Sequence, residues 1–251
     1  MDVPSMTESE NNTDSRPDLA MPRKAPSPLA DPIVCKMFQN ETVCRQAMKF
    51  IANAVIKNNK YRTFEEIKEI IKVTPQRLYS NYGPDGRSYR VDVEAETSDD
   101  DLILMEVQLG TFKSMTDRIL LYSASQSGSQ ARRSEELKDV IKQMKRVLSI
   151  NILDYAIRPS PHDFHQVSAF FYAEEPLELA SDKLQIHHLQ LELFRKIEPD
   201  FSNPLHVLLT SVDRAHTQKF HLKDVVFMDK NLKHLYDSDS GFAEFVDRFD
   251  L

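Results

Sequence analysis

The amino-acid sequence predicts an α/β fold with a mixed β-sheet core flanked by helices, and two observations support this prediction. Apolar residues recur at helical spacing shortly after residue 31 and again over residues 112–145. Elsewhere the apolar period changes to two, or the chain carries apolar runs of strand length. Because 41% of the 251 residues are hydrophobic, the chain can bury one sizeable core.

The composition divides the chain into three segments. Residues 1–30 are rich in Ser, Asn, Pro, Asp and Glu and have few aromatic or β-branched side chains. Such a segment buries too little apolar surface to offset the entropy lost on ordering, so we expect it to be disordered. We expect one α/β domain over residues 31–200, followed by a C-terminal, mostly helical extension over residues 201–251.

Three stretches predict helices. The apolar residues between Met48 and Val55 recur at helical spacing. A second helix is predicted over Thr63–Ile71, because Glu66 follows Thr63 by three residues, as in a capping box. Residues 112–145 predict a third helix. Its candidates for inward-facing side chains are Leu120, Leu121, Leu137, Val140, Ile141 and Met144.

Two neighbouring runs with a period of two predict an antiparallel hairpin. In RVDVEAET, Asp92 and Glu94 share one face, and in LILMEVQL, Glu106 and Gln108 share one face. The SDDD segment between the two runs is typical of a turn. Three later apolar runs, VLSINILDY, FHQVSAFFYAE and LQIHHLQLEL, predict further strands.

Charge is distributed unevenly along the chain. The net charge of −7, taken over the whole chain, argues against nucleic-acid binding. However, residues 36–91 carry eleven basic and five acidic side chains, residues 92–110 carry seven acidic and no basic ones, and residues 111–150 carry eight basic and four acidic ones. A metal site needs carboxylates and a phosphate backbone attracts Lys and Arg, so a nuclease fits this pattern. Solvated charged faces fit it equally well.

No feature of the sequence indicates secretion or a membrane partner. Cys35 and Cys44 make neither a disulfide framework nor a zinc motif, and are typical of reduced thiols in a cytoplasmic protein. No apolar stretch reaches membrane-spanning length, and the N-terminus lacks a basic and then apolar signal sequence. We therefore expect a cytoplasmic protein. The sequence leaves open whether it forms a homo-oligomer.

The hairpin brings two acidic residues together. If its turn is centred on Asp99, Asp92 lies opposite Glu106, with Cβ atoms roughly 4.5–5.5 Å apart. Gln108 lies two residues further along on the same face. Neighbouring carboxylates repel unless a cation lies between them, and Mg²⁺ prefers such oxygen ligands. We expect Asp92, Glu106 and the main-chain carbonyl of Val107 to bind the metal, with Gln108 orienting the attacking water or the phosphate.

Other interpretations of these residues remain open at the level of sequence. A solvent-facing strand also carries polar residues at alternate positions, and an Asp followed by E-x-Q is a loose pattern. Glu94 is a candidate second ligand on the Asp92 face, although we favour a solvated strand residue. The Pro84-Asp85 pair precedes Gly86 and is typical of a turn rather than of an active site.

Histidine pairs and a basic run also have two interpretations each. The pairs are His162/His165 and His187/His188, and they suggest zinc, but no third ligand is placed to complete a site. We therefore favour local β-structure or a phosphate contact. Arg132 and Arg133 begin a basic run that either follows a DNA backbone or forms an ordinary exposed helix face.

Several motifs in order along the chain add a more specific signal. They are DPIVCKMF, RVDVEAETSDDDLILMEVQL, TDRILLYSASQ, VLSINILDY and LQIHHLQLEL, and they span roughly Asp31 to Lys196. This series resembles the PD-(D/E)XK nuclease family transposases, which include recombination-promoting nucleases. In that family an Asp ends one strand, E-x-Q follows on the next, and an Arg and a Tyr lie on the following helix. Cys35 departs from the pattern, because a Phe is usual at that position.

The resemblance implies a restriction-endonuclease-like fold over residues 31–200. It implies a Mg²⁺-dependent DNA endonuclease (Mn²⁺ could replace Mg²⁺) of transposase or recombination-promoting type. It also implies that Asp92, Glu106 and Gln108 are the catalytic residues, and that Arg118 and Tyr122 bind DNA near the scissile phosphate. The alternatives are a catalytically inactive DNA-binding or interaction protein that retains the nuclease fold, and an interaction module whose acidic hairpin merely faces water.

Overall fold

The structure is a computed structural model that describes residues 41–61, 64–79, 89–108, 110, 114–131, 144–157, 163–175, 178–218 and 222–249. Some expectations fall outside these residues. They concern the disorder of residues 1–30, the Pro84-Asp85 turn, and the positions of Cys35, Arg132, Arg133, Leu137, Val140, Ile141 and His162.

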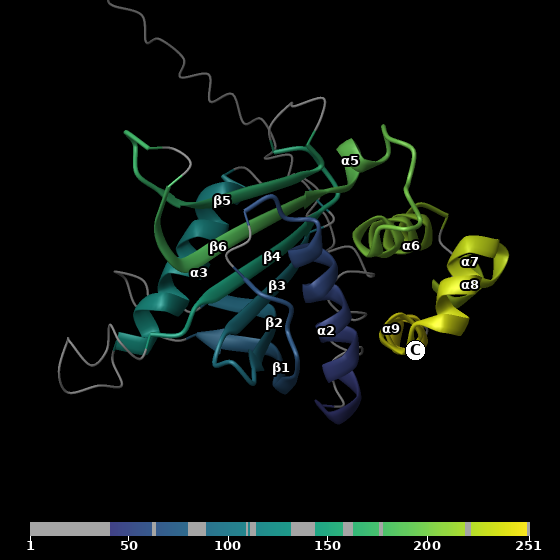
Figure 1. The fold of residues 1–251 in the computed structure, drawn as a ribbon, viewed down its shortest axis with the longest axis horizontal. Helices are drawn as coiled ribbons and strands as arrows, with labels where there is room; N and C mark the ends of the chain where they lie inside the picture. Colours follow the sequence, from purple (N-terminus) through teal and green to yellow (C-terminus); the bar gives the residue numbers. More distant parts are fainter. Residues whose placement is uncertain are drawn as a thin grey trace, which may run out of the picture.

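Six strands form one mixed sheet in the described part of the chain (Figure 1). The strands are β1 (Ile70–Tyr79), β2 (Tyr89–Thr97), β3 (Leu102–Gln108), β4 (Val147–Leu153), β5 (His165–Phe171) and β6 (Leu179–Gln190). Their order across the sheet is β1-β2-β3-β4-β6-β5. The pairs β3/β4 and β4/β6 are parallel and the other neighbours are antiparallel. The predicted mixed sheet flanked by helices is therefore confirmed.

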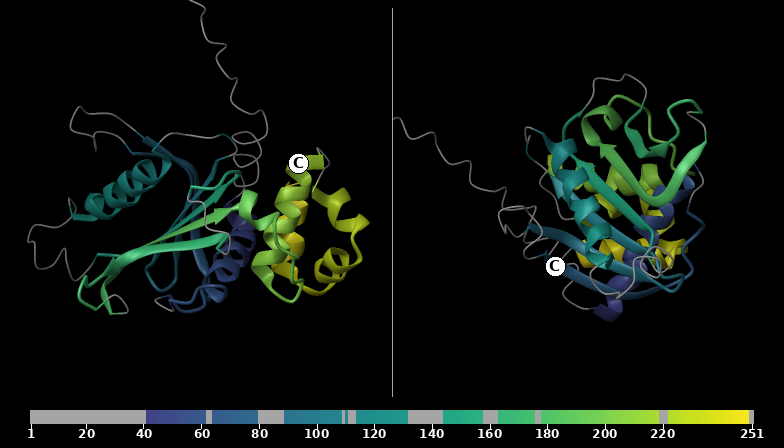
Figure 2. Two further views of the ribbon diagram at one scale, coloured as in Figure 1. Left: turned by 90° about the horizontal axis from the view of Figure 1, so that it is seen from above. Right: turned by 90° about the vertical axis from the view of Figure 1, so that its left-hand side faces the viewer.

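Two helices cover opposite faces of the sheet (Figure 2). Helix α2 (Glu41–Lys57) lies on one face and α3 (Met115–Ala131) on the other. Successive side chains of a strand point to opposite faces. Accordingly, Ile103 of β3 belongs to the core that includes α2, whereas Leu104 belongs to the core that includes Ile119 of α3. No helix in the described residues is long and apolar enough to span a membrane.

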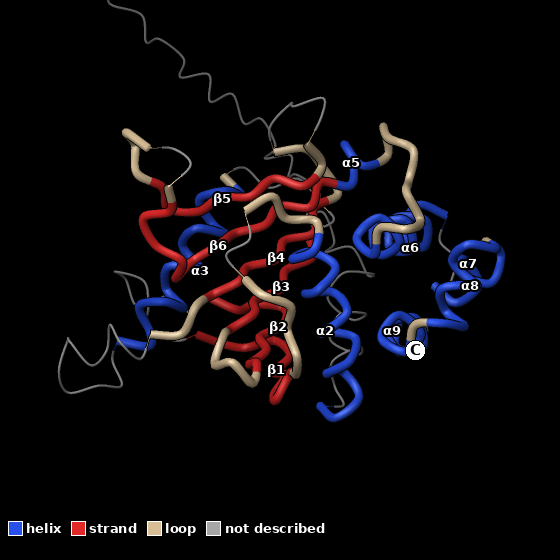
Figure 3. The backbone as a smooth tube through the Cα atoms, in the orientation of Figure 1, coloured by secondary structure: helices blue, strands red, loops and turns tan. Residues whose placement is uncertain are grey.

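The C-terminal residues are largely helical and gather beside α2 (Figures 1 and 3). The helices are α5 (Leu191–Phe194), α6 (Pro204–Gln218), α7 (Leu222–Met228), α8 (Lys230–Ser238) and α9 (Ser240–Phe249). The rings of Phe242 and Phe245 in α9 lie 5.5 and 6.2 Å from that of Phe50 in α2. Gly241 permits this approach, because a Cβ there would lie 3.2 Å from the Phe50 Cβ. The segment boundaries at residues 30/31 and 200/201 stay predictions.

The helix predicted over Thr63–Ile71 is wrong for the residues described there. Residues 64–69 are not helical, and β1 begins at Ile70. The side-chain amide of Asn53 in α2 donates to the Ile67 carbonyl (3.0 Å), and its oxygen accepts from the Ile67 N–H (2.8 Å). Ile67 and Ile70 are buried, so the residues that suggested a helical stripe fill the core from an extended chain.

The predicted inward face of the third helix is also wrong at Leu120 and Leu121. These side chains are 46% and 55% exposed. Helix α3 instead turns Ile119, Ser123 and Gln126 toward the sheet, and all three are buried. Because its second half packs through polar side chains, an apolar pattern could not identify the buried face.

Candidate active site on the α3 face of the sheet

The hairpin of β2 and β3 has the predicted register. Val93 pairs with Met105 and Glu96 with Leu102, so the next position beyond Val93 sets Asp92 against Glu106. A carboxylate oxygen of Asp92 accepts a hydrogen bond from the main-chain N–H of Val107 (2.9 Å). The Asp92 carboxylate therefore lies beside the Glu106–Val107 peptide.

Glu106 is buried rather than solvated. Its side chain lies on the face that carries Leu104 and α3, and the residue is 6% exposed. Asp92 is half-buried on the same face. A solvent-facing strand would expose both residues, so this alternative fails for Glu106. Burial of a carboxylate is unfavourable unless charged or polar groups compensate, which makes this acid a candidate for function.

Strand β1 is irregular opposite Asp92. Pro75 pairs with Val93 and Arg77 with Val91, so Gln76 stands opposite Asp92. Gln76 has a φ of 47°, in the left-handed region that residues other than Gly seldom adopt. Such backbone conformations are stored preferentially at functional sites. This distortion lies at the Asp92 end of the hairpin, and a separate register shift of β1, between Ile70 and Lys72, lies opposite the turn end.

Gln108 lies on the same face as Glu106, one alternation further along β3, and is half-buried. Its side-chain amide donates to the carbonyl oxygen of Gly110 (3.0 Å). The hydrogen bond fixes the amide at the end of the strand, where a planar polar group can orient a water molecule or a phosphate.

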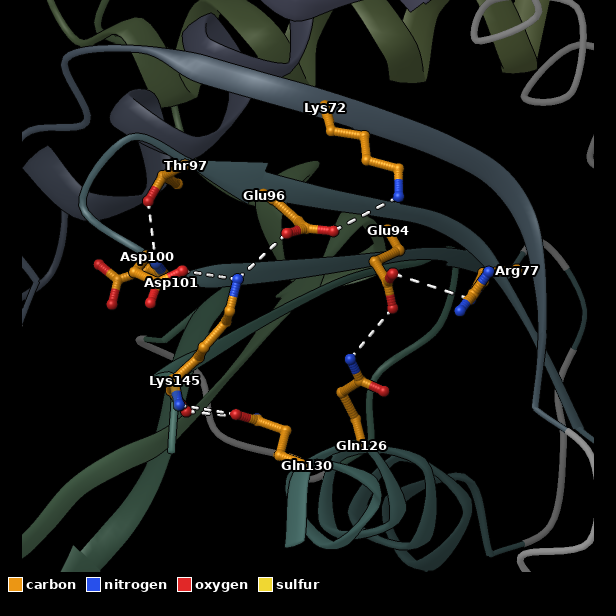
Figure 4. Close-up of polar contacts among 10 residues, drawn as sticks. All are labelled: Lys72, Arg77, Glu94, Glu96, Thr97, Asp100, Asp101, Gln126, Gln130 and Lys145. Carbon is orange, nitrogen blue, oxygen red and sulfur yellow. Dashed lines mark hydrogen bonds and ion pairs between the residues drawn. The ribbon is translucent and has the colours of Figure 1, made fainter. Parts of the chain in front are cut away.

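Glu94 is held by partners on α3 and β1, so we do not assign it as a second ligand (Figure 4). One of its carboxylate oxygens accepts from the Gln126 side chain of α3 (3.0 Å), and the other lies 3.8 Å from the guanidinium of Arg77. Glu94 is 6% exposed, so it is not a solvated strand residue either. Its contacts attach α3 to the sheet.

Glu96 and the turn of the hairpin are held by basic residues (Figure 4). Glu96 lies 3.6 Å from Lys72 and 3.1 Å from Lys145, and Lys145 also lies 2.6 Å from Asp100. Burial raises the pKa of Glu96, but the hydrogen bond and charge of Lys145, together with Lys72, outweigh burial and lower this pKa. Arg146 binds Asp101 through two hydrogen bonds of 2.7 and 2.6 Å. This part of the basic segment after α3 therefore neutralises the acidic turn.

Arg118 and Tyr122 lie one turn apart in the N-terminal half of α3. The Arg118 Nε donates to the Tyr122 hydroxyl (2.9 Å), and the guanidinium lies 5.0 Å from the centre of the Tyr122 ring. Both residues are half-buried. The ring thus orients the guanidinium, which is the group best suited to bind a phosphate. Arg132 and Arg133 follow this helix but lie outside the described residues.

Sequence reasoning missed Asn151 and Gln166, and it did not place His188 near Glu106. Across the sheet, Glu106 of β3 pairs with Asn151 of β4, and Asn151 pairs with His188 of β6. Gln166 of β5 pairs with His188. We call Asp92, Glu106, Asn151, His188 and Gln166 the transverse row. In the sequence, the one local signal for this row was the polar Asn151 inside the apolar run VLSINIL.

His165 and His187 belong to a hydrogen-bonded network. In the described residues no group of three or more His, Cys, Asp or Glu side chains is placed to hold a metal ion. His165 and His187 share a hydrogen bond of 2.8 Å, and His187 also bonds Gln185 (2.9 Å). Asn58 at the end of α2 bonds His165 (2.9 Å). Burial lowers the pKa of His187 well below its usual range, so this network is neutral and structural.

The mixed sheet with helices on both faces defines an α/β protein of the restriction-endonuclease-like class. The family model described as PD-(D/E)XK nuclease family transposase matches residues 32–237, and the chain belongs to this family. Comparison with curated proteins and with solved structures gives no significant match. Membership implies a nuclease-type function with DNA as the substrate class, and nucleases of this kind typically use divalent metals.

Proposed function

We propose that this protein is a metal-dependent DNA endonuclease of transposase or recombination-promoting type, acting in the cytoplasm. The observation that carries the proposal is the hydrogen bond from the Val107 N–H to Asp92, within a hairpin register that sets Asp92 against Glu106. Two carboxylates from adjacent strands thus converge on one partly buried spot. We assign catalysis to Asp92, Glu106 and Gln108.

The donor groups at this spot suit a hard dication. Mg²⁺ and Mn²⁺ prefer oxygen ligands, and Asp92, Glu106 and the Val107 carbonyl supply oxygens only. The Val107 N–H points at Asp92, and the N–H and C=O of one residue point to the same side of a strand, so its carbonyl also faces β2. When bound, the ion lowers the pKa of a coordinated water and neutralises charge on a phosphoryl oxygen.

The other site residues have roles that follow from their positions. Gln108 would orient the attacking water or the scissile phosphate from the end of β3. Arg118, held by Tyr122, would bind a phosphate of the DNA backbone. We also assign Arg132 and Arg133 to backbone contacts, on charge alone. Homo-oligomerisation is compatible with this function and is not required by it.

The proposal is tested by nicking of supercoiled plasmid with Mg²⁺, with Mn²⁺ and with a chelator. Glu106→Gln keeps the size and polarity of the side chain but removes the charge, so cleavage should fall by orders of magnitude while DNA binding is retained. Asp99→Asn is the matched control, because it removes one acidic charge from the exposed turn of the same hairpin. Equal nicking by wild type and Glu106→Gln would mean that the chemistry lies elsewhere. DNA binding without nicking by the wild type would favour the inactive protein that retains the nuclease fold.

A further inference from the structure

The transverse row continues the carboxylate pair across the sheet. Its members lie on neighbouring strands in direct register, from Asp92 and Glu106 through Asn151 to His188 and Gln166. Adjacent strands are roughly 4.8 Å apart, so the Cα atom of His188 lies about 10 Å from that of Glu106. A nucleotide that flanks a phosphate bound at Glu106 therefore comes within reach of His188.

The middle of this row is polar where an apolar layer would be expected. Leu104, Leu153 and Ile186 are buried around it on the same face. Asn151 and His188 are 1% and 4% exposed, and within the described residues the Asn151 Oδ1 and the His188 Nδ1 have no hydrogen-bond partner. Buried polar atoms without partners destabilise a fold and are rare. Apolar side chains would pack here at a lower cost in stability, so a polar pair next to the carboxylates argues for a role other than packing.

A cavity of about 690 Å³ adjoins the His188 end of the row. On the α3 side its wall includes Thr116, Ile157, Gln166 and His188. This volume is within the range of small-molecule sites, roughly 300–1,000 Å³. This side of the wall combines an apolar side chain with neutral hydrogen-bonding groups, because burial lowers the pKa of His188 to about 4. Elsewhere the wall includes Lys60 and Asp163, whose charged groups lie 3.9 Å apart and offset each other.

We infer that His188, supported by Asn151, binds an unpaired base of the nucleotide that flanks the scissile phosphate. The inference rests on the proposed function for the position of that phosphate. Neutral imidazole and amide groups hydrogen-bond the edges of bases, whereas phosphates are bound mainly by Lys and Arg. The base must leave its stack to enter the cavity, so single-stranded or locally unpaired DNA is the expected ligand. In this proposal His188 and Asn151 select the base, and Arg118 binds the phosphate backbone of the DNA.

The test measures binding to two fluorescein-labelled single strands of equal length and charge, one with all four bases and one fully abasic. It uses the Glu106→Gln protein with Mg²⁺, so that no strand is cleaved. His188→Leu should weaken binding of the base-containing strand about tenfold, or about 1.4 kcal/mol, and leave the abasic strand within about twofold. The slope of log K against log salt should not change, because no phosphate contact is lost.

Two further variants separate binding from folding. His188→Gln should retain the discrimination between the strands and His188→Asn should lose it, because the Nδ1 atom is fully buried and glutamine places its amide near the Nε2 position. This pair replaces His188→Leu if the latter does not fold. His187→Leu is the matched control: His187 is the neighbouring residue on the opposite face, so this change should lower stability and leave discrimination intact.

Equal weakening of both strands by His188→Leu, or a changed salt slope, would overturn the inference. The inference would also be overturned if the preference for the base-containing strand persisted in His188→Leu, His188→Gln and His188→Asn alike. The proposed function fails separately, if the wild type does not nick plasmid. Base discrimination that depends on His188 in a protein that does not nick would support the base-binding row and reject the endonuclease activity.

Discussion

Replacing Gln126 by methionine is expected to lower the free energy of unfolding by about 2 kcal/mol, because a hydrogen bond to a charged group contributes roughly 1.5–3 kcal/mol. The side-chain amide of Gln126 donates to the Glu94 carboxylate at 3.0 Å, and both residues are less than 7% exposed. Methionine has a similar length and preserves the packing. The substitution therefore removes the hydrogen bond and leaves a buried charge with one donor fewer.

The double variant makes this prediction sharper. Glu94→Met combined with Gln126→Met replaces both partners by apolar side chains, so neither a buried charge nor an unsatisfied amide remains. The double variant should therefore be more stable than Gln126→Met alone, by about 1 kcal/mol or more. Arg77, the other neighbour of Glu94, has a side chain that is 41% exposed and can turn to water.

Urea unfolding with matched m-values measures these differences, and a loss of about 2 kcal/mol lowers Tm by roughly 4–8 °C for a chain of this size. Ala124→Met is the control, because it places the same new side chain on the exposed side of α3, and it should change stability by less than about 0.5 kcal/mol. Additive losses in the double variant, or a Gln126→Met protein as stable as the wild type, would refute the view that this hydrogen bond attaches α3 to the sheet.

Titration calorimetry with Mn²⁺ should detect binding to the wild type and none to Asp92→Ala; equal heats from both proteins would remove Asp92 from the metal site. Arg118→Ala should weaken DNA binding and reduce the slope of log K against log salt by about 1, as for one lost phosphate contact, and an unchanged slope would contradict that role. Stability should fall as the pH is lowered from 6.5 toward 4, because burial lowers the pKa of His165 and of His188 to about 4 and the unfolded chain takes up protons first. Each histidine contributes up to roughly 3 kcal/mol to this loss of stability, and the loss is complete only near pH 4. Equal free energies of unfolding in urea at pH 7 and at pH 5 would disprove this prediction.

The hairpin register could be predicted from the sequence because two local signals agree. The alternation of Asp92 and Glu94 on one run and of Glu106 and Gln108 on the other defines two faces, and the acidic turn fixes their alignment. A slip of one residue would move every side chain to the opposite face of the sheet. Such a slip would bury the acids among the apolar residues of the α2 core, which is strongly unfavourable.

The start of β1 could not be predicted in the same way. Ile67 and Ile70 fit a helical stripe, and Thr63 with Glu66 fits a capping box, so local signals favoured a helix. The observed extended chain depends on Asn53, which binds the main chain of Ile67 from a different element. Likewise, the neighbourhood of Asn151 and His188 depends on the order β3-β4-β6, which is a property of the whole sheet and not of any one segment.

The three acids on one face of β2 have the same spacing but different neighbours, and the neighbours set their roles. Glu96 stands opposite Lys72 of β1 and forms an ion pair with it. Lys145 links Glu96 to Asp100 in the turn. Glu94 meets Gln126 and positions α3 (Figure 4). Asp92 alone lies opposite a further acid, Glu106, at a place where β1 is distorted. Alternation along one strand can predict that the three share a face. Only the residues across from each acid distinguish two structural carboxylates from the one that we propose to bind a metal, and those residues are fixed by strand pairing.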